Sequence, residues 1–199
     1  MGLQIIGIIK IQLVLLLLKS LRLLIGDPAR SGDAFGAIGL EGTWPERKIY
    51  TRFAKQYWKE SYTSVAKKFA VLYNRIKPHL LLLEKNFEYD KVSQAFMHLP
   101  VKYVTTSTGL TDKTKAKGWS VDKNFMIGWL QIEYKKHTIL FPENPTDDMR
   151  ELINQRNQIV GITGPSGHVS YKAQRHRHDD LFMAKLIGCN AIRIWWDMQ

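Results

Sequence analysis

The chain has 199 residues, enough for one domain with a substantial core, and its 45% hydrophobic and 24% charged residues exclude a disordered composition. A net charge of +11 favours a polyanionic partner, either nucleic acid or an anionic membrane surface. The single cysteine, Cys189, excludes an internal disulfide framework and a cysteine-based zinc site.

Residues 1–20 are interpreted as an apolar N-terminal segment, and residues 21–199 as the globular domain. Residues 2–18 are mostly Ile, Leu and Val, but Lys10 interrupts them. A membrane span requires roughly 20 largely apolar residues, which this stretch reaches only by including Lys10 and Lys19. A helix packed on the domain, or a junction to a missing domain, is therefore preferred to a membrane anchor. We expect a cytoplasmic protein.

The first half of the chain predicts a meander followed by a parallel crossover. Strands are expected at residues 22–26, 35–41 and 48–57, forming an antiparallel meander. Helical periodicity covers residues 61–76, with Ser61 or Thr63 as the N-cap. The unbroken leucine run at residues 80–83 is typical of a buried parallel strand and delivers Glu84 at its end.

The second half alternates short elements. The pattern predicts helices and strands in the following ranges: helices at 89–98, 121–134, 145–158 and 179–192, and strands at 101–104, 138–141 and 168–171. Residues 105–118 are interpreted as a basic loop, and the glycine-rich residues 161–167 as a turn that lacks the Lys-Ser/Thr of a P-loop. The expected fold class is α/β, with a central mixed five-stranded sheet flanked by helices.

Acidic residues follow two predicted strands and begin the last helix. Asp27 follows the first strand, Glu84 follows the fourth, and Asp179 and Asp180 begin the helix after a basic stretch. A right-handed crossover would make those strands neighbours, and ligands gather at the carboxyl ends of strands. Such a cluster repels itself unless cations occupy it. The pattern therefore predicts a site for Mg²⁺ or Mn²⁺, with two ions acting on a phosphodiester.

Each acid also has a purely structural interpretation. Asp27 precedes Pro28 and suits a turn, and Glu84 suits a solvated strand end. Asp179 suits an N-cap, and Asp180 suits the positive end of the helix dipole. Their order, their placement at strand ends and their basic surroundings together favour the metal site.

Three segments resemble the successive acidic motifs of the nuclease domain of phage terminase large subunits: LLIGDPARSGDAFGAIGLEG (23–42), LLLLEKNFEYDKVSQAF (80–96) and VSYKAQRHRHDDLFMAKLIG (169–188). The resemblance spans roughly residues 21–192. It implies an RNase H-like fold and a viral endonuclease that cuts concatemeric double-stranded DNA during genome packaging. The implied partners are that DNA, an ATPase motor domain, and portal or capsid components. The chain has no Walker A sequence for such a motor.

The resemblance also implies roles for individual residues. Asp27 would be the first-strand metal ligand, Glu84 the fourth-strand ligand, and Asp179 or Asp180 the ligand from the last helix. Asp33 matches a commonly acidic position of the first loop, although it also suits a turn. Met183 stands where many relatives carry a further aspartate, which leaves fewer carboxylates for a second ion.

Basic residues supply candidate DNA contacts. We expect phosphate contacts from the following cations, with a solvated charged loop as the alternative for the lysines: Lys113, Lys115, Lys117, Arg175 and Arg177. His178 is a candidate contact for the scissile phosphate, or else a capping or packing residue. Three other functions stay open: a Holliday-junction resolvase or transposase-type nuclease, a catalytically weak DNA-binding packaging module, and a membrane-associated basic protein.

Overall fold

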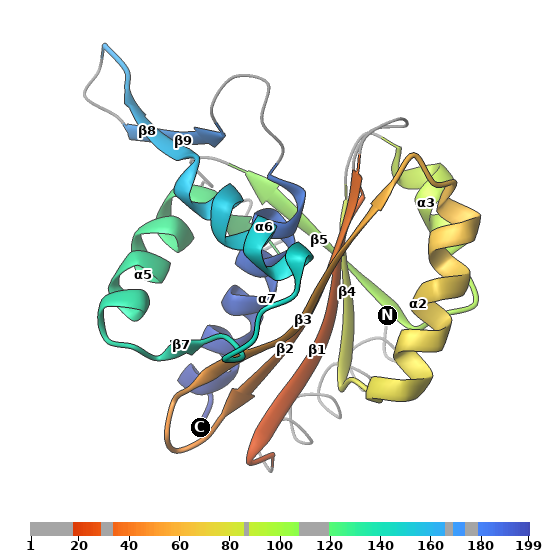
Figure 1. Ribbon diagram of the computed structural model, residues 1–199, viewed down its shortest axis with the longest axis horizontal. Helices are drawn as coiled ribbons and strands as arrows, with labels where there is room; N and C mark the ends of the chain where they lie inside the picture. Colours follow the sequence, from red (N-terminus) through yellow and green to blue (C-terminus); the bar gives the residue numbers. More distant parts are fainter. Residues whose placement is uncertain (1–17, 29–33, 86–87, 108–119, 166–168, 174–178) are drawn as a thin grey trace, which may run out of the picture.

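A seven-stranded mixed sheet separates two layers of helices (Figure 1). The computed structural model describes residues 18–28, 34–85, 88–107, 120–165, 169–173 and 179–199. The strand order is β6-β5-β4-β1-β2-β3-β7, with α5, α6 and α7 on one face and α2 and α3 on the other. The segment 1–17 lies outside the described residues, so its interpretation stays a prediction. None of the helices described is both long and apolar enough to cross a membrane.

The centre of the sheet confirms the predicted meander and crossover. The strands β1 (Ser20–Asp27), β2 (Ala34–Thr43) and β3 (Ile49–Trp58) pair antiparallel. The crossover helix α2 (Tyr62–Ile76) begins at Ser61, whose hydroxyl accepts a hydrogen bond from the Ser64 amide at 3.2 Å. It leads into β4 (Leu80–Glu84), which pairs parallel with β1 and thereby becomes its neighbour.

The expected strand count of five is wrong, because short strands extend the sheet at both edges. β5 (Val101–Ser107) runs three residues beyond its predicted end, into the expected basic loop. β6 (Ser120–Asp122) pairs parallel with those residues and satisfies their backbone groups. At the other edge, β7 (Ile139–Leu140) pairs with β3.

The remaining elements follow the predicted order with shifted bounds, except that β8 was not expected as a strand. They are α3 (Tyr89–Ala95), α5 (Lys123–Lys135), α6 (Asp147–Asn157), β8 (Ile159–Thr163), β9 (Val169–Ala173) and α7 (Asp180–Asp197). Gly161 lies in β8 opposite Tyr171 of β9, so the turn expected to begin there begins later. The side-chain amide of Asn124 donates to Val169 O and accepts from Tyr171 N, which ties the separate β8–β9 hairpin to α5.

The helix α7 lies unusually close to the sheet. A methyl group on Gly36 would come within 2.6 Å of the Asp180 backbone, and one on Gly188 within 2.7 Å of Ile25 and Leu40. The missing side chains therefore let the helix rest directly on β1 and β2. Cys189 is buried in this layer, as the apolar context of the sequence predicts.

Candidate active site

The parallel pairing of β1 with β4 brings the carboxylates of Asp27 and Glu84 together at the carboxyl ends of these two central strands. Gly26 pairs with Leu83, so the next residue of each strand lies at the same level. The side chain of Asp27 is buried, and that of Glu84 is partly buried. Parallel β1 and β4 thus place the first two predicted ligands side by side at their carboxyl ends.

The start of α7 reaches the same strand ends through Gly36. This glycine is the register partner of Asp27 in β2, and its Cα hydrogen faces the backbone of Asp180. Asp180 is buried, whereas Asp179 remains partly accessible. We call the resulting set of Asp27, Glu84, Asp179 and Asp180 the carboxylate cluster.

Burial and the three other acids of the carboxylate cluster all act on the ionisation of Asp27. Burial raises the pKa of Asp27 well above that of an ordinary aspartate, and repulsion from Glu84 together with hydrogen bonding to it raises it further. Asp180 and then Asp179 add smaller contributions in the same direction. Asp27 therefore holds a proton in conditions where an exposed aspartate has lost it.

Two neighbouring side chains hold members of the carboxylate cluster, and sequence reasoning missed both. The Thr106 hydroxyl, from the unexpected extension of β5, donates a hydrogen bond to Glu84 Oε1. Lys123 Nζ, at the start of α5, lies 3.3 Å from Asp179 Oδ2 and is largely shielded from solvent. Lysine and threonine are too common in polar segments for the sequence to single out these two.

A third missed residue, Gln155, holds the backbone at the start of α7. Its Oε1 accepts hydrogen bonds from the amides of Leu181 (2.9 Å) and Phe182 (3.2 Å), and it is fully buried. The sequence does contain one indication that Gln155 is buried: it lies at helical spacing from Met149 and Leu152, which form the apolar face of α6.

The donor set suits a hard divalent cation. Carboxylate oxygens are the ligands that Mg²⁺ and Mn²⁺ prefer, and a bound cation would replace the proton on Asp27 and offset the repulsion. Within the described residues, no three acidic, histidine or cysteine side chains are already arranged as a metal-binding group. Thr106 and Lys123 hold two of the carboxylates, so ligation would require side-chain reorientation.

The remaining predicted site residues fall outside this geometry. Residues that lie outside the described part of the chain are Asp33, Lys113, Lys115, Lys117, Arg175, Arg177 and His178. Their predicted contacts with DNA or with the metal site stay predictions. Met183, at the position where the resemblance leads one to expect a further aspartate, is buried in the core.

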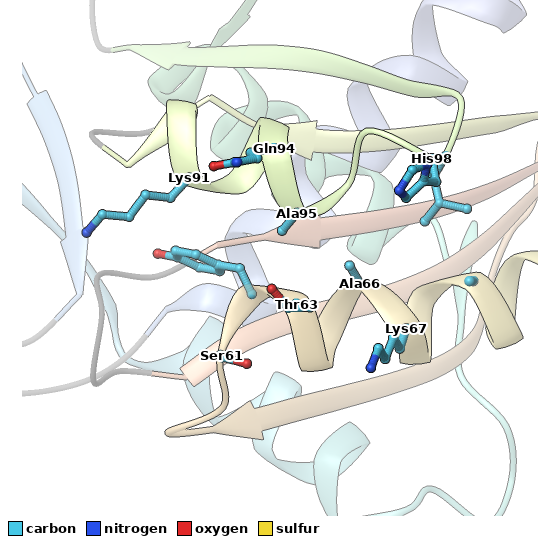
Figure 2. A pocket seen from close by; sticks show the side chains of 11 residues that line it. Ser61, Thr63, Ala66, Lys67, Lys91, Gln94, Ala95 and His98 are labelled. Atoms are coloured by element: carbon cyan, nitrogen blue, oxygen red, sulfur yellow. The ribbon is translucent and has the colours of Figure 1, made fainter.

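A cavity of about 740 Å³ lies elsewhere, between α2 and α3 on the opposite face of the sheet. Figure 2 shows Ala66 and Ala95 lining it, with Lys67, Lys91 and His98 around them. No acidic side chain is among the described residues that line it. This cavity therefore lacks the ligands for a divalent cation, and the carboxylate cluster is the better candidate for chemistry.

Comparison with known proteins shows the fold. No family model matches the chain, and no curated protein does. The large terminase nuclease of thermophilic phage G20c is similar in structure, with a TM-score of 0.59 and 12% identity over 86% of this chain and 82% of that one. For the P22 large terminase nuclease domain the TM-score is 0.60, with 9% identity over 91% and 87%.

The likeness extends to other viruses. The human cytomegalovirus terminase nuclease domain gives a TM-score of 0.53 and 10% identity over 89% of this chain and 88% of that one. The G20c nuclease is also known with bound magnesium and with bound cobalt. The chain thus has the fold of terminase large-subunit nuclease domains, which confirms the expected RNase H-like architecture.

Proposed function

We propose that this protein is a metal-dependent endonuclease that cleaves double-stranded DNA during viral genome packaging. The observation that carries the proposal is the buried Asp27 at the carboxyl end of β1, whose pKa is raised by burial and then by Glu84, Asp180 and Asp179. A buried and mutually repelling set of acids is unfavourable for stability alone, because each charge loses its hydration. Binding of cations would compensate for that cost.

Two further observations support the proposal. Terminase nuclease domains share the fold, and the G20c domain binds magnesium. The net charge of +11 suits a DNA substrate, although the acids themselves repel phosphate. Cations held by the carboxylate cluster would reverse that local repulsion. An ATPase motor is the partner that a packaging role requires.

Each residue of the site has a proposed task. Asp27, Glu84 and Asp180 would hold Mg²⁺ or Mn²⁺, with Asp180 rather than Asp179 as the principal ligand from α7, since it is the more buried and the stronger influence on Asp27. When bound, two such ions supply Lewis acids that polarise the phosphodiester and lower the pKa of water.

The neighbouring side chains hold two of these acids while no cation is bound, and both contacts would rearrange on ligation. Thr106 fixes the rotamer of Glu84 through its hydroxyl, and the ammonium group of Lys123 balances the charge of Asp179. Lys123 is also close enough to the carboxylate cluster to attract a phosphate. No serine, cysteine or histidine nucleophile is needed for this hydrolysis.

The proposal is tested by removing one charge at a time. Asp27→Asn and Glu84→Gln should each lower Mn²⁺-dependent plasmid nicking by at least ~100-fold, since each removes a ligand needed in the transition state. Asp147→Asn is the matched control, because that side chain is 98% exposed on α6 and distant from the chemistry. Circular dichroism should show that all three variants fold.

Undiminished nicking by either cluster variant would contradict the assignment. Calorimetry with Mn²⁺ separates the nuclease from a catalytically weak DNA-binding module, for which no binding is expected. Mn²⁺ affinity should rise with pH through the raised pKa of Asp27, because the cation must displace that proton. An affinity independent of pH would show that Asp27 is not a ligand.

A further inference from the structure

From the hydrogen bonds at the start of α7 we infer that Gln155 is a positioning residue, which caps this helix so that Asp179 need not. The inference rests on the proposed function, because it concerns the same carboxylate cluster. It adds a residue from α6, a helix that contributes none of the four acids.

The start of α7 has an aspartate in the position that normally caps a helix. A side chain at this position usually accepts a hydrogen bond from the amide two or three residues later. Here those amides belong to Leu181 and Phe182. Within α7, which the structure describes throughout, Asp179 makes no such side-chain bond.

The two amides are instead satisfied by a single oxygen of Gln155. Its Oε1 lies 2.9 Å from Leu181 N and 3.2 Å from Phe182 N. The orientation of the amide group is fixed from its other end, where Nε2 donates to Glu151 Oε1 at 3.4 Å. Gln155 thus occupies both positions that the carboxylate of Asp179 would otherwise take.

This arrangement decides where the acidic side chain points. With the helix already capped, the carboxylate of Asp179 turns to Lys123, 3.3 Å away, at the carboxylate cluster. Without Gln155, two buried amides would lack an acceptor, and the nearest carboxylate could satisfy them. Asp179 and Gln155 therefore compete for the same donors.

The competition can be tested without metal, by amide hydrogen exchange on the full chain. In Gln155→Met, Leu181 and Phe182 should keep slow exchange, because Asp179 takes over as cap. In Gln155→Met combined with Asp179→Ala, both amides should exchange roughly tenfold faster, as expected for loss of an N-cap. Equal exchange in the single and double variants would overturn the inference.

A second measurement follows the consequence for metal binding. Gln155→Met should weaken Mn²⁺ binding at least roughly tenfold by calorimetry, because Asp179 leaves the carboxylate cluster and the backbone next to Asp180 loses the acceptor that holds it. Leu152→Ala is the control: Leu152 is also buried on α6, so its truncation destabilises the same helix without removing a hydrogen-bond acceptor. Its Mn²⁺ affinity should stay within roughly twofold of the parent.

Gln155→Glu guards against a variant that fails to fold. It keeps an oxygen acceptor for both amides, and when it is combined with Glu151→Gln a donor also remains between the two side chains, so Mn²⁺ affinity should be retained. A folded protein with both substitutions that loses affinity as Gln155→Met does would overturn the inference. If the parent itself binds no Mn²⁺, the proposed function fails, while the exchange measurement still decides the role of Gln155.

Discussion

The helices α6 and α7 both begin with two consecutive aspartates, yet the two pairs have opposite surroundings. In α6 the preceding Thr146 caps the helix, and its hydroxyl accepts a bond from the Met149 amide. Asp147 is solvent-exposed and pairs with Arg150. Asp148 binds Lys55 at 2.9 Å. Asp148 also accepts a hydrogen bond from the Gln56 amide at 3.1 Å, so Asp147 stabilises the helix start and Asp148 ties α6 to β3.

In α7 the two aspartates, Asp179 and Asp180, are not needed to cap the helix. A glutamine of another helix caps the chain, and Asp180 is buried where it raises the pKa of Asp27. Two acids at a helix start are thus insufficient to indicate a site. The informative difference is whether their local role is performed by another residue.

The largest expected effect separates the two pairs by activity. Asp180→Asn should reduce Mn²⁺-dependent nicking by at least ~100-fold, about 3 kcal/mol of transition-state stabilisation. Asp148→Asn should leave nicking within about twofold of the parent, since its partners are Lys55 and the Gln56 amide and asparagine keeps an oxygen acceptor for that amide. Similar losses in both variants would remove the distinction between the helices.

One added methyl group at Gly36 should displace α7 from the sheet. Gly36→Ala places a Cβ within 2.6 Å of the Asp180 backbone, so the helix must shift, and overpacking should lower the free energy of unfolding by about 3 kcal/mol. Gly128→Ala, in open space on α5, should instead raise it by about 0.5–1 kcal/mol. Urea denaturation measures both, and a neutral Gly36→Ala would show that the close approach does not constrain α7.

A second buried ionisable group distinguishes the interior of α7. Lys185 is fully buried, with Nζ 3.0 Å from Thr51 Oγ1 and 3.8 Å from the ring centre of Phe141. Burial, and secondarily the charge of Arg156, lower its pKa from 10.5 to about 7, despite an opposing influence of Cys189. The folded state therefore disfavours protonation, and stability is lost as pH falls from about 10.5 to about 7.

Removing this amine should stabilise the protein. Lys185→Met is expected to raise the free energy of unfolding by about 2 kcal/mol at pH 7, after loss of the Thr51 bond, and by progressively less towards pH 10. Arg150→Met, at an exposed ion pair of α6, should change it by less than about 0.5 kcal/mol at either pH. A stabilisation by Lys185→Met that is independent of pH would contradict the lowered pKa.

The smallest expected effect on Mn²⁺ affinity concerns Thr146, the N-cap of α6, in contrast to Gln155, which caps α7. Thr146→Ala removes the local cap of α6 and should cost about 1 kcal/mol of stability. Mn²⁺ affinity should stay unchanged, because the aspartates of that helix take no part in the carboxylate cluster. A weakened affinity, measured by calorimetry, would show that the two helix starts are coupled.

The sequence predicted the centre of the fold well, because strong local signals coincide there. The leucines of β4 allow only a buried strand, and Ser61 caps α2 where the pattern placed the helix start. The edge strand β6 was missed, and β7 was expected but is shorter than predicted, because their three and two residues carry no periodicity. Their pairing partners, rather than their own residues, make them strands.

The acids of the candidate site were identifiable, while their supporting residues were not. Asp27 and Glu84 end predicted strands, so topology alone brings them together. Thr106, Lys123 and Gln155 become relevant only through contacts between distant segments. A buried lysine such as Lys185 is also unpredictable, because its neighbours come from β3, from α5 and from the segment after β7.

The contact between Gly36 and Asp180 has a consequence for the order of folding. It joins positions separated by most of the chain, and the carboxylate cluster is complete only after this contact forms. The sheet strands that hold Asp27 and Glu84 can pair earlier, through contacts much closer in sequence. A ribosome-bound chain still lacking α7 would therefore present Asp27 and Glu84 without the two aspartates of α7, so the carboxylate cluster can be completed only after nearly the whole chain has been synthesised.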